Sequence, residues 1–169
     1  MYGLYITFVW LHLIAAAVWV GGMVFFAAVI VPVLRHPDYR ARAGDLVHRT
    51  GVRFRWLGWI ALGTLIATGT YLVIHRGVGL TELTSPTFYA TSFGRTLAAK
   101  LLVVAAIVVA TLVHDLSMGP RATRLLRESP NDPRAQRIRV VARYWGRANW
   151  LLALVVLARA AMLVRGAPW

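Results

Sequence analysis

The chain has 169 residues, of which 59% are hydrophobic, and its mean hydropathy is +0.62. This composition excludes a soluble globular domain, which would lack enough polar surface to cover itself, and the absence of Cys excludes disulfides, thiolate metal sites, iron–sulfur clusters and covalently attached haem. The formal net charge is +13, but the cations lie in loops between apolar segments, so we expect no nucleic-acid partner.

Four apolar segments follow one another along the chain, at residues 5–31, 56–75, 96–116 and 148–165. Each is close to the roughly 20 residues that a helix needs to cross the hydrocarbon of a bilayer. The first is too long for a cleaved signal peptide and lacks its basic start, so we expect it to remain in the mature protein. The sequence therefore predicts an all-α membrane protein, with residues 1–169 forming one antiparallel bundle of four transmembrane helices.

The basic residues predict the orientation of the chain in the membrane. The loop at 35–55 and the loop at 117–147 together hold 14 of the 19 cations, whereas the loop at 75–95 between them holds only Arg76 and Arg95. Positive loops face the cytoplasm, so we expect both termini and the middle loop outside a bacterial inner membrane. Most of these arginines then contact anionic lipid, and short interfacial helices, such as residues 134–147, are expected in the basic loops.

Histidines and isolated cations within or beside the spans are the candidate functional residues, because polar groups at membrane depth are costly. His12, His75, Lys100 and Arg159 fall at the outer side, where they are expected to form one cluster. Arg159 lies twelve residues beyond Arg147, or roughly 18 Å along a helix. On the inner side, His48 and His114 are expected to form a second cluster, with Asp115 and His36 nearby. The candidate metal ligands are His12, His48, His75 and His114. For His36 and His75, near the boundary, a solvated imidazole is the alternative interpretation.

Helical spacing also groups small and aromatic residues. The first span carries one such stripe, consisting of His12, Ala15, Ala16, Trp19, Gly22, Met23 and Phe26. Trp19, two turns from His12, is a candidate cofactor contact, although helix packing is the more common role of such stripes. In the third span, Lys100 and His114 share one face about 21 Å apart. Five tryptophans are predicted to be interfacial anchors: Trp10, Trp56, Trp145, Trp150 and Trp169.

Lys100 and Arg159 need a negative partner, and no carboxylate lies deep inside a predicted span. The propionates of a non-covalent b-type haem would offset these charges while its iron binds an imidazole, so one or two haems b are the leading cofactor hypothesis. Copper is the alternative. Imidazole suits Cu(II), whereas the four methionines are scattered rather than clustered for Cu(I).

Four blocks of sequence resemble the copper-resistance D domain family of bacterial membrane proteins. They begin at Leu11-His12, His48-Arg49-Thr50-Gly51, Phe93-Gly94-Arg95-Thr96 and His114-Asp115-Leu116. The resemblance covers nearly the whole chain and implies a helical membrane protein that handles copper. A more distant likeness, carried by His12 and Lys100-Leu101-Leu102-Val103-Val104, is to HemJ-type protoporphyrinogen oxidases, which bind haem b.

Three hypotheses therefore stand at this point. The first is a haem b protein in redox chemistry, passing electrons across the membrane or acting on a small substrate, with His12 as an axial ligand. The second is copper transport or copper resistance, and the third is a membrane scaffold. A protoporphyrinogen oxidase-like enzyme is a further alternative to these three. A homo-oligomer and an unidentified redox partner are compatible with the first two.

Overall fold

The computed structural model describes residues 2–34, 36–39, 42–118, 121 and 133–165. The chain divides into two compact units, Met1–Leu83 and Thr84–Trp169, which are described one at a time. All regular structure in the described residues is helical. Four helices are long and apolar enough to cross a membrane, in the segments Tyr2–Val33, His48–His75, Ser92–Ser117 and Tyr144–Arg165. Each predicted span falls inside one of these segments, so the prediction of an all-α protein with four membrane-length helices is confirmed.

The first unit begins with α1 (Tyr2–Phe25), followed by the π-helical turn η1 (Phe26–Ile30) and the short α2 (Val31–Val33). Pro32 explains the π-helical turn, because its ring displaces the carbonyl four residues earlier and it has no backbone N–H to donate. A single turn of 3₁₀ helix, η2 (Pro37–Tyr39), lies before α3. The first span is therefore one long helix with a local irregularity near its basic end.

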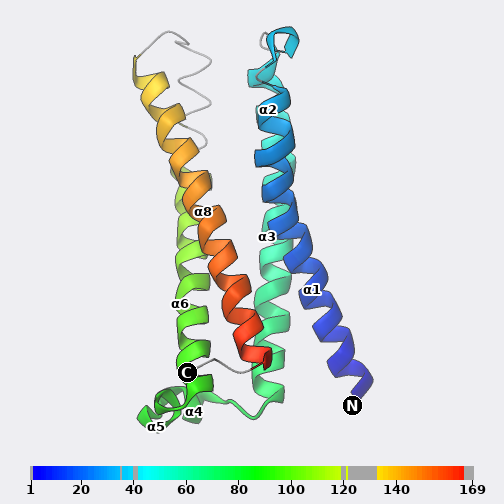
Figure 1. Cartoon of the computed structure of the whole chain (residues 1–169), viewed down its shortest axis with the longest axis vertical. Helices are drawn as coiled ribbons and strands as arrows, with labels where there is room; N and C mark the ends of the chain where they lie inside the picture. Colours follow the sequence, from blue (N-terminus) through cyan, green and yellow to red (C-terminus); the bar gives the residue numbers. More distant parts are fainter. Residues whose placement is uncertain (1, 35, 40–41, 119–120, 122–132, 166–169) are drawn as a thin grey trace. The chain divides into compact units, whose positions relative to one another are not determined.

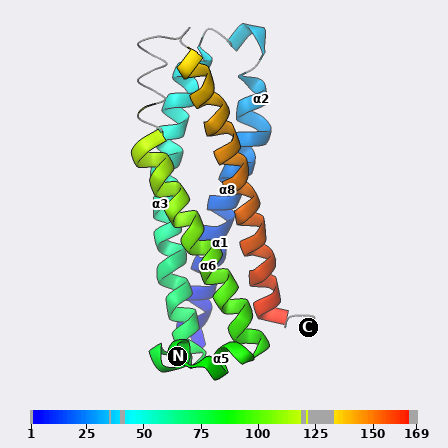
Figure 2. The same ribbon diagram turned by 90° about the vertical axis from the view of Figure 1, so that its left-hand side faces the viewer.

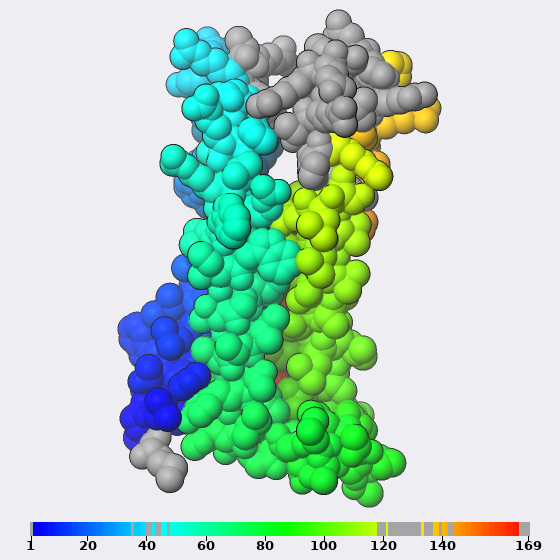
Figure 3. Space-filling model, turned by 180° about the vertical axis from the view of Figure 1, so that it is seen from behind, coloured from blue at the N-terminus to red at the C-terminus, as the bar shows by residue number. Residues whose placement is uncertain are grey.

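The helix α3 (Ala43–His75) is a single element of 33 residues, about 50 Å long. Residues 43–55, which we expected in a loop, are its first turns. This segment has no proline, and the guanidinium of Arg49 pairs with the carboxylate of Asp45 one turn earlier at 2.9 Å. The helix therefore extends well beyond the apolar span, and Figure 3 shows it as a continuous column of side chains from cyan to green.

Gly77 ends α3 in a left-handed conformation, with φ at +80°. The Gly77 N–H donates to the carbonyl of Ile74 at 2.9 Å and the Val78 N–H donates to that of Val73 at 3.3 Å, which is the hydrogen-bond pattern of a Schellman motif. The side chain of Val78 is buried. Helix α3 is thus stopped by a specific glycine rather than by the end of its apolar run.

The segment between α3 and α6 contains two short helices, α4 (Leu80–Thr84) and α5 (Pro86–Ala90). The Glu82 carboxylate accepts hydrogen bonds from the Gly79 N–H at 2.7 Å and the Thr81 hydroxyl at 3.1 Å. The Gly79 N–H, with the N–H of Glu82 itself and the Thr81 hydroxyl, lowers the pKa of Glu82. Glu82 thus closes the start of α4 as one half of a capping box.

The second unit contains α6 (Ser92–Val113), the π-helical turn η3 (His114–Met118) and α8 (Pro133–Arg165). The Thr91 hydroxyl caps α6 by accepting from the Gly94 N–H at 2.9 Å. Gly94 is needed there because any Cβ would collide with the carbonyl group of Phe88. Residues 134–147 and 148–165, which we expected as separate interfacial and transmembrane helices, form the single helix α8.

Each unit is an antiparallel pair of long helices, α1 with α3 in the first unit and α6 with α8 in the second (Figures 1 and 2). In the first pair, Tyr5 stacks on His75 at one end and Phe26 on Phe54 towards the other. In the second, Trp145 contacts Ala110. The assembly of the two pairs into one four-helix domain stays a prediction.

Candidate functional site

The best-defined candidate residue is His12, on α1, which faces Thr68 of α3. Its Nδ1 lies 2.8 Å from the Thr68 hydroxyl, which is buried. That hydroxyl has one hydrogen, and it donates this hydrogen to the Thr64 carbonyl at 2.6 Å. The hydroxyl must then accept from His12, so Nδ1 carries the ring proton and Nε2 carries the lone pair. Metal-binding histidines have this tautomer and this type of support.

Gly69 provides the place where the His12 ring meets α3. A Cβ added to Gly69 would lie 3.3 Å from Cε1 of His12, which is tighter than ordinary packing. The absence of a side chain therefore lets the imidazole lie directly against the helix backbone. The ring is half-buried and its orientation is set by two neighbouring residues of one helix turn, Thr68 and Gly69.

The remainder of the His12 stripe packs against α3. Ala15 and Trp19 are buried, and Trp19 lies against Gly58. A Cβ on Gly22 would collide with the ring of Phe54. Helix packing, the more common role of such stripes, therefore accounts for these residues. Trp19 stays a predicted cofactor contact, and its ring already lies in the helix interface.

His75, the last residue of α3, lies within a stack of aromatic rings. Its ring centroid is 4.9 Å from that of Tyr5 and 5.8 Å from that of Tyr71, and Tyr71 stacks in turn on Phe8 at 3.9 Å. His75 is exposed, and whether water or a ligand contacts its ring stays a prediction. His36 is exposed too and pairs with Asp38 at 3.3 Å. These ring contacts hold the first turns of α1 against the last turns of α3.

The histidines of the first unit stand at separate depths. Because α3 is continuous, His75 is about 10 Å along the helix from Thr68, the residue that faces His12, and half-buried His48 is about 30 Å from it in the other direction. These three imidazoles cannot meet at one ion. Each would serve as a single ligand from this unit.

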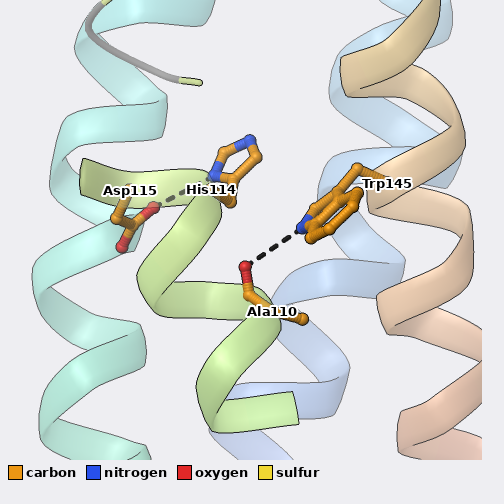
Figure 4. A network of polar contacts seen from close by, with 4 residues as sticks. All are labelled: Ala110, His114, Asp115 and Trp145. Atoms are coloured by element: carbon orange, nitrogen blue, oxygen red, sulfur yellow. Dashed lines mark hydrogen bonds and ion pairs between the residues drawn. The ribbon is translucent and has the colours of Figure 1, made fainter. Parts of the chain in front are cut away.

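In the second unit, His114 begins the π-helical turn η3 and pairs with its neighbour Asp115 (Figure 4). Nδ1 of His114 lies 3.0 Å from Oδ1 of Asp115, whose side chain is only 14% exposed. A carboxylate on Nδ1 holds the proton there and leaves the lone pair on Nε2. His114 thus presents the same nitrogen as His12, supported by a charged partner in place of a hydroxyl.

Trp145 fixes α8 beside this turn. Its indole N–H donates to the carbonyl of Ala110, one turn before His114, at 3.0 Å (Figure 4). The Trp145 side chain is half-buried, whereas those of Trp10 and Trp56 are exposed, and Trp169 lies outside the described residues. That these tryptophans are interfacial anchors stays a prediction.

Lys100 on α6 and Arg159 on α8 are both half-buried and lie at similar depths. Measured from the Ala110–Trp145 contact, Lys100 is about 15 Å along α6 towards Ser92, and Arg159 is about 21 Å along the antiparallel α8 in the same direction. Two cations therefore lie within about one helix turn of each other in depth. Lys100 is also the only lysine of the chain.

No three His, Cys, Asp or Glu side chains within the described ranges gather as a metal site would require. The predicted outer cluster, with His12, Lys100 and Arg159, draws on both units, as does the inner cluster with His48 and His114. Both clusters stay predictions. Within each unit, the structure shows supported single imidazoles instead of a multidentate site.

Sequence analysis missed Thr68, whose hydroxyl determines the His12 tautomer. Two signals were available: Thr64 and Thr68 lie four residues apart in an apolar helix, and a threonine there bonds the preceding carbonyl. The pairing of His12 with Thr68 depends on the α1–α3 register, which no local pattern reveals.

Comparison with known proteins gives two matches. The family model described as copper resistance protein D matches residues 48–163. An uncharacterised protein of Aquifex aeolicus (strain VF5) is 30% identical over 155 residues, which cover 89% of this chain and 88% of that protein. No solved structure gives a significant match. The family match includes most of α3, the whole of α6 and most of α8.

Proposed function

We propose that the chain, which belongs to the copper resistance protein D family, is a membrane protein that holds a redox-active metal centre through single imidazoles. We propose further that this centre is haem b. The observation that carries the proposal is the hydrogen bond from His12 to Thr68. It orients a half-buried imidazole inside a membrane helix and places the lone pair on Nε2, as an axial ligand requires.

The number of available ligands favours haem. A porphyrin supplies four nitrogens itself, so the protein needs to supply only one or two axial ligands. A copper ion needs several ligands from the protein, and no group of three suitable side chains occurs within the described ranges. Supported single imidazoles such as His12 and His114 fit the first requirement.

The charges on α6 and α8 favour an acidic ligand. Lys100 and Arg159 lie at similar depth in helices whose described membrane-embedded portions carry a carboxylate only at Asp115, near the basic end. The two propionates of haem b have the chemistry to offset two cations. Lys100 and Arg159 would then hold the acid groups and the His12 imidazole would bind the iron, as expected from the sequence, with His48 and His114 as candidate ligands of a second iron.

A haem held in this way supplies one-electron redox chemistry. The residues of the chain hold and orient the group and exclude water from it. With one site near each side of the membrane, the protein would pass electrons across the bilayer. With one site alone, it would act on a small substrate.

Copper handling is the second candidate, and the family match is the observation that favours it. In this case His12, His48, His75 and His114 serve as successive stations for the ion, with the imidazole nitrogens as ligands. The two candidates differ in a directly visible property, because haem colours the protein and copper bound to isolated imidazoles hardly does.

Purification of the full chain in detergent, followed by visible absorption and metal analysis, tests the proposal. We expect a Soret band and stoichiometric iron. His12→Ala should remove or shift the band, and free imidazole added to this variant should restore it, whereas His36→Ala, at an exposed histidine outside the long helices, should leave it unchanged. Colourless protein that binds copper would support the second candidate. Unchanged spectra in both His12→Ala and His114→Ala would reject the ligand assignment.

A further inference from the structure

One exposed side of α3 changes character along its length. Leu46, Arg49, Arg53, Trp56 and Ile60 are spaced three or four residues apart, so they lie on one face of the helix. All five are exposed, with Trp56 at 68% and Ile60 at 65%. From Arg49 towards the end of α3 at His75, the face passes from guanidinium groups to an indole and then to an aliphatic side chain.

The helix geometry places this transition at the membrane boundary. If α3 leaves the hydrocarbon at His75, the roughly 20 residues that cross it reach back to Trp56. Arg53 then lies about 4.5 Å and Arg49 about 10.5 Å beyond the hydrocarbon. The polar headgroup layer is about 5 to 7 Å thick, so Arg53 lies at the level of its phosphates and the backbone of Arg49 a few ångströms beyond it, a distance that a long arginine side chain spans.

We propose that Arg49, Arg53 and Trp56 form a binding site for the headgroup of an anionic phospholipid. The phosphodiester contacts the guanidinium of Arg53, and a second negative or polar headgroup atom contacts Arg49. The Trp56 ring lies at the level of the glycerol esters, where indole is favoured. One acyl chain then runs along Leu57 and Ile60, both of which are exposed.

Charge complementarity and the apolar continuation favour a lipid over a free phosphate. The segments at 35–55 and 117–147 carry 14 of the 19 cations, which attract anionic headgroups. A free phosphate would use the arginines but not the exposed aliphatic surface that follows them. Asp45 pairs with Arg49, but an exposed i,i+4 pair of this kind is weak and does not prevent Arg49 from binding an anion.

The basic part of α8 carries the same combination of groups. Tyr144 is 64% exposed, and the guanidinium of Arg147 lies 6.0 Å from its ring centroid. Leu151, one turn further, is 55% exposed. An arginine and an exposed aromatic residue thus lie near the start of the apolar part in each of these two helices, a combination that suits a headgroup layer.

Native mass spectrometry of the full chain released from detergent tests this site. Phosphatidylglycerol and phosphatidylcholine with identical acyl chains are added separately, and sn-glycerol 3-phosphate provides the headgroup without chains. The test variant is Arg49→Gln with Arg53→Gln. The control is Arg42→Gln with Arg137→Gln, which removes two exposed cations further from the apolar parts of α3 and α8.

We expect the intact chain to retain phosphatidylglycerol over phosphatidylcholine, and the test variant to lose about fivefold in this selectivity for each guanidinium removed. The control should change much less, and glycerol phosphate should not compete. Equal losses in the two variants, equal retention of the two lipids, or competition by glycerol phosphate would each overturn the proposal. Both variants change exposed side chains, and matching circular dichroism spectra and thermal midpoints will show that folding is unaffected. The site is independent of the haem proposal, since the assay requires no metal.

Discussion

Thr68 is the residue that gives His12 a defined chemical state. Its hydroxyl donates to a backbone carbonyl of its own helix and accepts from Nδ1 across the interface. An imidazole without such a partner would exchange between tautomers, and only one of them offers Nε2 as a ligand. The proposed ligand therefore depends on a second residue that would not itself bind the metal.

Thr68→Val, which keeps the shape of the side chain but removes the hydroxyl, should weaken the preference of His12 for the tautomer with its proton on Nδ1. Loss of a neutral hydrogen bond of about 1 kcal/mol lowers the preference for protonated Nδ1 by about fivefold. The ¹⁵N chemical shifts of labelled histidine, recorded above pH 8 in the metal-free chain, report the tautomer directly, and His12→Ala identifies the signal. Thr68→Ser should restore the original shifts. A wild-type His12 with its proton on Nε2 would contradict the arrangement.

At the level of the helices, packing in this protein relies on small residues and on specific ends. Gly22, Gly58 and Gly69 each lie against an aromatic ring of the partner helix. Because lipid provides no hydrophobic force between helices, such close approach is a main source of their association. Specific residues determine where the helices begin and end: Gly77 terminates α3, and Thr91 with Gly94 caps the start of α6.

Gly77→Ala should lower the free energy of unfolding by about 1 kcal/mol, because a Cβ is unfavourable at a positive φ. Gly63→Ala is the matched control. Gly63 lies in the interior of the same helix with no atoms near the position of a new Cβ, so alanine should be neutral or stabilising by up to about 1 kcal/mol. Thermal unfolding in detergent measures both. If the two variants had equal thermal midpoints, Gly77 could not have the left-handed conformation at the end of α3.

For the whole molecule, the distribution of charge predicts the direction of insertion. The basic segments at 35–55 and 117–147 are expected on the cytoplasmic side, and the loop with α4 and α5 on the outer side. The structure supports the alternation through its two antiparallel helix pairs, whereas the side of the membrane is a prediction from charge alone.

The absence of native Cys allows a direct test of this orientation. Leu80→Cys and Asp38→Cys place single thiols at exposed positions in successive loops. A membrane-impermeant maleimide should label Leu80→Cys in intact cells and Asp38→Cys only after permeabilisation. The reverse pattern would invert the topology, and labelling of both in intact cells would mean that α3 does not cross the membrane.

The apolar runs alone were enough to predict the number, type and approximate position of the four membrane-length helices, because in lipid every backbone group must be paired within its own segment. His12 and His114 could also be identified as candidate functional residues from the sequence, because an imidazole among apolar residues is costly. The extension of α3 was missed, because polar residues at helical spacing give no apolar signal although they form helix equally well. The expected interfacial helix at 134–147 is helical, but its continuity with the last span was not predicted.

The partners of these side chains were beyond the reach of any local pattern. The pairing of His12 with Thr68, of Trp145 with the Ala110 carbonyl and of Gly22 with Phe54 depends on the register between helices. In a membrane, this register is set by the summed fit of many small contacts along two helices, none of which is distinctive by itself. Residue types therefore identified the candidate functional groups, whereas helix packing determined which atom of each group can bind a ligand.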